Sequence, residues 1–225
     1  SFILAGIACA LAALCYSELA SMLPVSGSAY SYAYATMGEL MAWIIGWDLI
    51  LEYALASSTV AIGWAGYLTS FLDSVGFHLP SYLSTAYLAN PAEGFINLPA
   101  TVIILLLTGL LVMGIRQSAI FNFVMVLIKL TVILYILVAG VLTGVVLYSN
   151  LNVAAPIALA VDQMGMNWLS PLIKLGAIAG LTSVMLVLLM GQSRIFYSMA
   201  NDQLLPPLFA KVHNKYQTPH LSTLL

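Results

Sequence analysis

Charged residues are scarce in this chain of 225 residues: they make up 6% of it, against 62% hydrophobic residues. Soluble domains carry about 25% charged residues, so this composition excludes an ordinary water-soluble fold. The mean hydropathy of +1.04 points the same way. The net charge is only −2 and the six basic residues form no run. We therefore expect no nucleic-acid partner.

Cysteines and catalytic motifs are also few. Cys9 and Cys15 lie six residues apart on one expected helix, about 9 Å along its axis, which is too far for a disulfide without unwinding. The chain has no phosphate-binding loop and no nucleophile elbow, and its three histidines lack metal-ligand spacing. We expect neither an enzyme nor a cofactor.

Long hydrophobic runs are what the sequence does contain. Apolar runs of about 20 residues indicate transmembrane helices, because hydrocarbon cannot hydrogen-bond to an open backbone. Five such spans are expected at about 1–20, 40–70, 98–114, 118–149 and 171–199. The sequence thus predicts an all-α integral membrane protein, with 1–225 as a single, incomplete transmembrane domain. The absence of an initiator Met and the apolar C-terminal end indicate a piece of a longer protein.

Basic residues orient these spans. One side of the membrane is predicted to carry Arg116, Arg194, Lys211 and Lys215. The opposite loops hold Asp73, Glu93 and Asp162, with Lys174 at the margin of the last span. Lysine and arginine are enriched in cytoplasmic loops, so the first group is assigned to the cytoplasm. The segment 201–220 is then a cytoplasmic loop, and we expect the membrane to be the plasma membrane.

Two stretches of the chain resemble a known family. The first, 15–58, contains P-x-S-G-S-A-Y and G-W-x-L-x-L-E-Y, and the second, 191–225, contains R-x-x-Y-x-M-A-x-D-x-L-L-P. Together with the turn G-x-R-x-S at 114–118, these resemble the amino acid/polyamine/organocation permeases, and specifically their cationic amino acid transporter branch. The resemblance implies two inverted five-helix repeats, with substrate held at the midplane by broken first and sixth helices.

The resemblance also implies that helices are missing. On the family pattern, 1–20 is similar to the second helix, 40–70 to the third, 98–114 to the fourth and 171–199 to the eighth. The run 118–149 resembles the start of the fifth helix joined to the end of the seventh, with a seam near residues 131–134. The first and sixth helices would then be absent. A continuous helix over 118–149 would be about 48 Å long, against a hydrocarbon core of about 30 Å.

Lys129 is the strongest candidate for a functional residue. It lies about 16 Å from the start of its span, near the bilayer centre, where a lysine costs roughly 2.5–3.5 kcal/mol to insert. The resemblance implies that Lys129 couples transport to protons, with Thr182 and Ser183 as its matching hydroxyls. The alternative is a lysine merely tolerated at a protein-facing or lipid-facing position.

A second group of candidates lies on the span 40–70. Glu52, Ser57 and Ser58 could line a substrate or proton pathway. Alternatively, Glu52 is an acid reached by water near the cytoplasmic end, and the hydroxyls bond to their own backbone. For Asp48 the favoured interpretation is likewise an acid reached by water near the cytoplasmic end, and for Glu18 it is an interfacial position.

These observations predict a proton-coupled secondary active permease that imports or exchanges L-amino acids. Its expected partners are the amino acid substrate, protons and membrane lipid, and a homo-oligomer or an intact permease could pack against it. The alternative is a truncated or degenerate permease without transport activity, or a membrane accessory subunit. The missing helices favour that alternative, because they would hold the substrate.

Overall fold

The structure is a computed structural model of the whole chain. It describes residues 2–25, 27–87, 91, 94–113, 120, 122–124, 144, 146, 153, 156–164, 168 and 170–224. The predicted span 118–149 therefore lies mostly outside the described residues, and so does Lys129.

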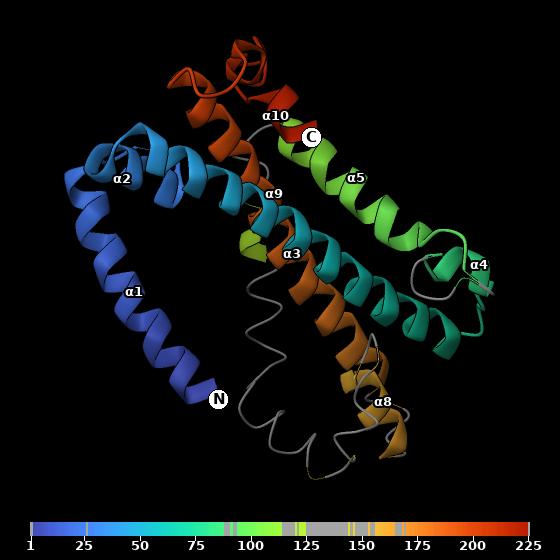
Figure 1. Ribbon diagram of the computed structural model, residues 1–225. Helices are drawn as coiled ribbons and strands as arrows, with labels where there is room; N and C mark the ends of the chain where they lie inside the picture. Colours follow the sequence, from blue (N-terminus) through green and yellow to red (C-terminus); the bar gives the residue numbers. More distant parts are fainter. Residues whose placement is uncertain are drawn as a thin grey trace. The chain divides into compact units, whose positions relative to one another are not determined.

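Helices account for nearly all regular structure in the described part of the chain (Figure 1). They are α1 (Phe2–Met22), α2 (Ser28–Met37), α3 (Glu39–Ser74), α4 (Ser81–Ser84), α5 (Leu98–Met113), α8 (Pro156–Gln163), α9 (Ser170–Asn201), the 3-10 helix η2 (Pro207–Ala210) and α10 (His220–Leu224). The described residues contain no strand beyond an isolated bridge between Ala86 and Phe95. The predicted all-α fold class is confirmed.

In the described part of the chain, three helices are long and apolar enough to cross a membrane, namely Leu4–Met22 within α1, Glu39–Ser74 and Ser170–Asn201. They cover the predicted spans 1–20, 40–70 and 171–199. The fourth apolar helix, α5, has 16 residues, about 24 Å of helix, which is shorter than a hydrocarbon core of about 30 Å. At 36 residues, α3 is about 54 Å long and exceeds that thickness.

The chain divides into two compact units, Ser1–Tyr53 with Met190–Leu225, and Ala54–Leu189. Tyr30 of α2 is the centre of the first unit. It is fully buried among Ala42 and Ile50 of α3 and Ile195 and Met199 of α9. Its hydroxyl donates a hydrogen bond of 2.7 Å to Asp202 Oδ2, just beyond the end of α9.

Two glycines permit this packing. Gly38 joins α2 to α3 with a φ of +87°, a left-handed conformation that side chains with a Cβ rarely adopt. A Cβ at Gly46 would lie 2.6 Å from the sulfur of Met199 and 3.1 Å from the Tyr30 ring. Glycine at position 38 thus permits the turn, and glycine at position 46 permits the close approach of α3 to α9 in this unit.

The second unit is centred on the later part of α3 and the early part of α9. Tyr67 packs against Ala177, Ile178 and Leu181, and Ile157 of α8 covers the same cluster. The backbone N–H of Ile157 donates to the Tyr67 hydroxyl at 3.4 Å. One aromatic residue of α3 thus holds both α8 and α9.

The Tyr30–Asp202 hydrogen bond can be tested by replacing Tyr30 with Phe, which removes the hydroxyl and keeps the ring. A hydrogen bond to a charged group contributes about 1.5–3 kcal/mol, and burial together with the Asp202 carboxylate raises the pKa of Tyr30, so the hydroxyl keeps its proton. We expect a clearly lower melting temperature of the detergent-solubilised protein, followed by tryptophan fluorescence.

Tyr34→Phe is the matched control, because the Tyr34 hydroxyl makes a longer bond of 3.5 Å to Glu39 in an exposed setting. It should lower the melting temperature much less. If both variants lowered the melting temperature equally, the Tyr30–Asp202 hydrogen bond would not stabilise the protein.

Candidate functional site

Thr182 and Ser183 lie side by side in the middle of α9 and are both 5% exposed. Thr182 donates to the carbonyl of Ile178 at 2.7 Å and accepts a hydrogen bond of 2.8 Å from the Trp64 indole N–H. Its hydroxyl therefore ties α9 to α3 within the second unit. The Trp64 partner was not predicted, although an indole in a transmembrane helix needs an acceptor and so signals one.

Ser183 makes a different contact. Its hydroxyl donates to Asn122 Oδ1 at 2.6 Å, across 61 residues of sequence. Asn122 belongs to the start of the run 118–149, and sequence reasoning did not single it out. An amide within an apolar run is a usable signal, because it must find a partner in hydrocarbon.

The hydroxyl pair is better suited to accept hydrogen bonds than to donate more. Each hydroxyl has one hydrogen and two lone pairs. The hydrogen of Thr182 is used on Ile178 and that of Ser183 on Asn122, while Thr182 accepts once, from Trp64. Within the described residues, lone pairs remain on both oxygens, and the group that they fit is a donor such as an ammonium.

The candidates on α3 have other surroundings. Ser57 is buried and Ser58 exposed, and both hydroxyls donate to the carbonyl of Ala54, at 3.1 and 2.8 Å. Ser58 also lines an apolar cavity of about 450 Å³ in the second unit, where α5 lies beside α3. Glu52 is exposed, as is Asp48 one turn before it. Glu52 belongs to the first unit, whereas Thr182 and Ser183 belong to the second.

Lys174 is a buried charge that the sequence placed at the margin of the last span. It is 3% exposed, and its Nζ lies 3.2 Å from Asp162 Oδ2 and 3.2 Å from the carbonyl of Ser70. The Ser170 hydroxyl donates to the other oxygen of Asp162 at 2.5 Å. Ser170 and Lys174 are one turn apart on α9, so a single face of that helix holds the Asp162 carboxylate of α8.

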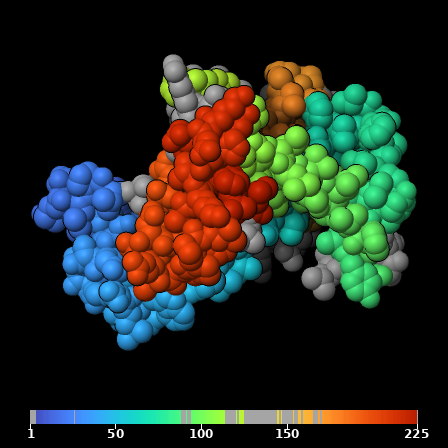
Figure 2. Space-filling model, turned by 90° about the horizontal axis from the view of Figure 1, so that it is seen from above, coloured from blue at the N-terminus to red at the C-terminus, as the bar shows by residue number. Residues whose placement is uncertain are grey.

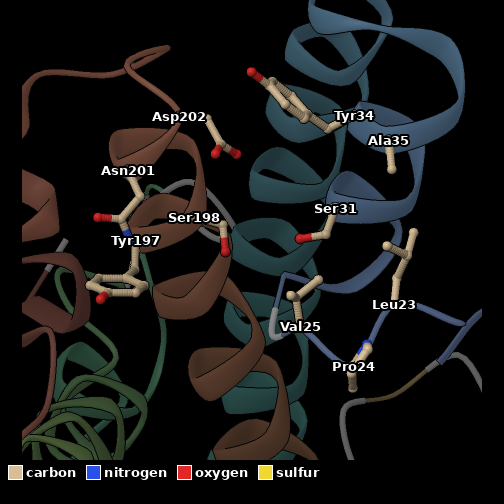
Figure 3. Close-up of a pocket in the computed structure, with 10 residues that line it drawn as sticks. All are labelled: Leu23, Pro24, Val25, Ser31, Tyr34, Ala35, Tyr197, Ser198, Asn201 and Asp202. Atoms are coloured by element: carbon tan, nitrogen blue, oxygen red, sulfur yellow. The ribbon is translucent and has the colours of Figure 1, made fainter. Parts of the chain in front are cut away.

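A cavity of about 550 Å³ opens in the first unit beside α2 and the end of α9 (Figure 3). Ser31 and Ser198 point toward one another across it, and Asp202 lies above them in this view. Pro24 and Tyr197 also line it. Two of the motifs that carry the family resemblance, 24–30 and 194–206, thus meet at this cavity, and the Tyr30–Asp202 hydrogen bond joins them.

The described residues contain no group of three or more histidine, cysteine or acidic side chains that could hold a metal ion. Their functional chemistry consists of hydroxyls, amides and isolated charges set into apolar helices. That combination defines a class, the all-α membrane proteins that carry polar sites within the bilayer.

Comparison with known proteins identifies the family. An amino acid permease model matches residues 1–147, and a second amino acid permease model matches residues 130–225. This chain belongs to the amino acid permease family of the amino acid/polyamine/organocation superfamily, and the expected family is confirmed.

Several named relatives are similar over the whole chain. The methylthioribose transporter of Bacillus subtilis (strain 168) is 38% identical over 100% of this chain and 64% of its own length. The branched-chain amino acid permease BcaP of the same organism is 36% identical, over 99% of this chain and 64% of its own. The vacuolar cationic amino acid transporter 4 of Arabidopsis thaliana is 29% identical, over 100% and 50%. The chain therefore spans about two thirds of the bacterial relatives and half of the plant one.

The alignments are longer than the chain. They run over 296 and 298 positions for the two bacterial relatives, whereas the chain has 225 residues. Since all or nearly all of the chain is aligned, internal segments of these relatives have no counterpart in it.

The Lys174–Asp162 pair yields an asymmetric prediction. Asp162→Asn leaves a buried ammonium without its counter-ion, whereas Lys174→Met leaves a carboxylate that is 49% exposed and can be hydrated. Removing one partner of a buried pair costs about 3–5 kcal/mol. We expect Asp162→Asn to lower the free energy of unfolding by roughly 2–4 kcal/mol. The loss is smaller than for a fully buried pair, because the Asp162 side chain is half exposed.

Thermal melting of both single variants and of the double variant measures this difference. The double variant, which has no unpaired buried charge, should melt above Asp162→Asn alone. A larger loss in Lys174→Met than in Asp162→Asn would mean that the ammonium is not buried as described.

Proposed function

We propose that this chain carries the framework of a proton-coupled secondary active permease for L-amino acids, working as an importer or exchanger in the plasma membrane. The membrane is part of the proposal, because some relatives are named vacuolar, mitochondrial or chloroplastic. The observation that carries the proposal is the buried Thr182–Ser183 pair of α9, where the family resemblance expects the coupling site.

The Ser183–Asn122 hydrogen bond supports the assignment of Lys129 as the coupling residue. It brings the start of the run 118–149 against the hydroxyl pair. Lys129 follows Asn122 by seven residues, about two helical turns, so both would share one face of a helix. Lysine side chains on a helix lean toward its N-terminus, which here is the direction of Asn122.

Proton coupling then follows from the acceptor capacity of the hydroxyls. A protonated Lys129 amine would donate to the free lone pairs of Thr182 and Ser183, and the deprotonated amine would lose most of that attraction. The two protonation states therefore favour different packing against α9. Coupled to rocking of helices around a central site, this difference links proton release to alternating access.

In this proposal 1–225 form one permease domain with five spans, and 201–220 lie on the cytoplasmic side. The long helices α3 and α9 each run through both compact units, which supports a single domain. Glu52, Ser57 and Ser58 would border the substrate or proton pathway. Of these, Ser58 has the best support, since it lines a cavity.

A second candidate is a permease-derived protein without transport activity, or an accessory subunit that packs against an intact permease. A specific observation favours it. The alignments with the two bacterial relatives are longer than the chain, so internal segments of those relatives are missing from it. The sequence resemblance assigns the missing segments to the sixth helix, which would hold substrate. Function depends on the site and not on the fold alone.

Uptake into proteoliposomes separates the two candidates. We expect radiolabelled L-leucine or L-arginine to accumulate above the level of empty liposomes, and more strongly when the outside is more acidic than the inside. These probes follow the relatives named for branched-chain and cationic amino acids. Uptake equal to that of empty liposomes for both probes would leave the non-transporting candidate.

The coupling site is tested in the same assay with variants. Lys129→Ala should abolish the dependence of uptake on the pH gradient. Ser183→Ala should weaken that dependence about fivefold, as expected for one lost hydrogen bond of about 1 kcal/mol. Thr59→Ala is the matched control, because the exposed Thr59 hydroxyl bonds to the carbonyl of Leu55 in its own helix and should leave the pH dependence unchanged.

An unchanged pH dependence in Lys129→Ala would contradict its assigned role. An equal effect of Thr59→Ala and Ser183→Ala would mean that loss of any hydroxyl in these helices acts in the same way, and that the α9 pair has no special part.

A further inference from the structure

The segment after α9 forms a small folded element of its own. The Phe209 ring stacks on Phe196 of α9, with ring centroids 5.6 Å apart. The Ser222 hydroxyl donates to the carbonyl of Phe209 at 2.7 Å, and the backbone N–H of His213 donates to the carbonyl of Thr218 at 2.8 Å. These contacts tie η2, the following turn and α10 together within the first unit.

This element borders an open, basic cavity of about 550 Å³. Its lining includes Lys211, His213, Asn214, Lys215 and His220. The segment 203–225 contains two lysines and two histidines and no acidic residue, so no carboxylate of its own neutralises the cavity. Figure 2 shows the C-terminal part of the chain, coloured red, on the surface of the molecule.

The two histidines are arranged differently. His213 Nδ1 accepts from the backbone N–H groups of Lys215 and Tyr216, at 3.2 and 3.4 Å, so a neutral ring carries its hydrogen on Nε2 as a donor. The ring of His220 meets that of His213 edge-on, with centroids 5.4 Å apart. Its Nδ1 is enclosed and has no hydrogen-bond partner among the described residues.

An enclosed imidazole nitrogen without a partner calls for an explanation in a folded protein. Turning the His220 ring over about its Cβ–Cγ bond exchanges its nitrogens with its carbons, so a ligand that offers an oxygen could recruit it. The cavity also offers several donors. They are the ammonium groups of the lysines, the ring Nε2–H of His213 and the side-chain NH₂ of Asn214. A compact, multiply charged oxyanion satisfies such a set, and phosphate has that chemistry.

We propose that this cavity binds a phosphate group, supplied either by the head group of an anionic lipid or by a free phosphate. The expected orientation of the chain places 201–220 on the cytoplasmic side, where anionic lipids concentrate. The site shares no residue with the proposed transport site on α9, and its occupancy does not depend on whether the chain transports.

Histidine signals provide a direct measurement, because the chain has only three histidines. His213 and His220 line the cavity, whereas His78 lies beyond the end of α3 and contacts Asp73, and serves as an internal reference. The full chain, labelled with ¹³C-histidine, is placed in phosphatidylcholine nanodiscs and titrated with inorganic phosphate. A second sample is placed in nanodiscs that contain phosphatidylglycerol, without free phosphate.

We expect the His213 and His220 signals to shift saturably in at least one sample and the His78 signal to stay. A shift only with phosphatidylglycerol assigns the site to lipid, and a shift with inorganic phosphate in phosphatidylcholine assigns it to free phosphate. No shift in either sample would overturn the proposal. So would an equal shift when sodium chloride replaces phosphate at the same ionic strength, because screening alone would then explain it.

Variants test whether the lysines form the site. Replacing both Lys211 and Lys215 with Gln should weaken the apparent affinity about 25-fold, at about fivefold for each cationic residue near a membrane surface. The control replaces both with Arg, which keeps the charge, and should retain affinity within a few-fold. Unchanged affinity in the Gln variant would overturn the proposal. Folding of each variant is checked at His78, whose signal keeps its position in the folded chain and moves if the chain unfolds.

Discussion

A bilayer offers no hydrogen-bond partner to a peptide group, so every N–H and C=O of a spanning segment must be paired inside the chain. This constraint makes α1, α3 and α9 helical, whatever their individual residue propensities. It extends to side chains. Ser57, Ser58 and Thr59 all return their hydroxyl hydrogens to carbonyls of their own helix.

Some polar side chains bond to a different segment of the chain and not to their own helix, and these contacts show which segments pack together. Trp64 cannot reach its own backbone carbonyl with the indole N–H, and it bonds to Thr182. Ser183 bonds to Asn122 instead of a carbonyl of its own helix. Lys174 pairs with Asp162 and Ser70. Each of these contacts joins separate segments, so the pairing of polar groups in an apolar setting holds the helices together.

The family motifs gain a physical meaning from the structure. Gly27 lets the start of α2 lie close to α9, since a Cβ there would lie 2.8 Å from the Ser198 hydroxyl oxygen, and Tyr30 bonds to Asp202 nearby. The acid of the later motif is thus a hydrogen-bond acceptor for the tyrosine of the earlier one. The two motifs are parts of one packing unit that the chain brings together from its beginning and its end.

Hydropathy alone determined that this chain is an all-α membrane protein, because hydrophobic length and the need for backbone pairing depend only on local sequence. The bounds of α1, α3 and α9 follow from it within a few residues. The resemblance of residues 24–30 and 194–206 pointed to the permease family. The candidate hydroxyls Thr182 and Ser183 were also named from sequence, but their partners were not.

Only the tertiary structure decided the pairings. Trp64 and Thr182 are 118 residues apart, and Tyr30 and Asp202 are 172 apart. The sequence placed Lys174 at the margin of the last span. In the structure it is buried and forms an ion pair with Asp162. Helices that are apolar on all sides show no preferred face, so their sequence periodicity does not specify which helix each side meets. Side-chain packing and the matching of buried donors with acceptors make that choice.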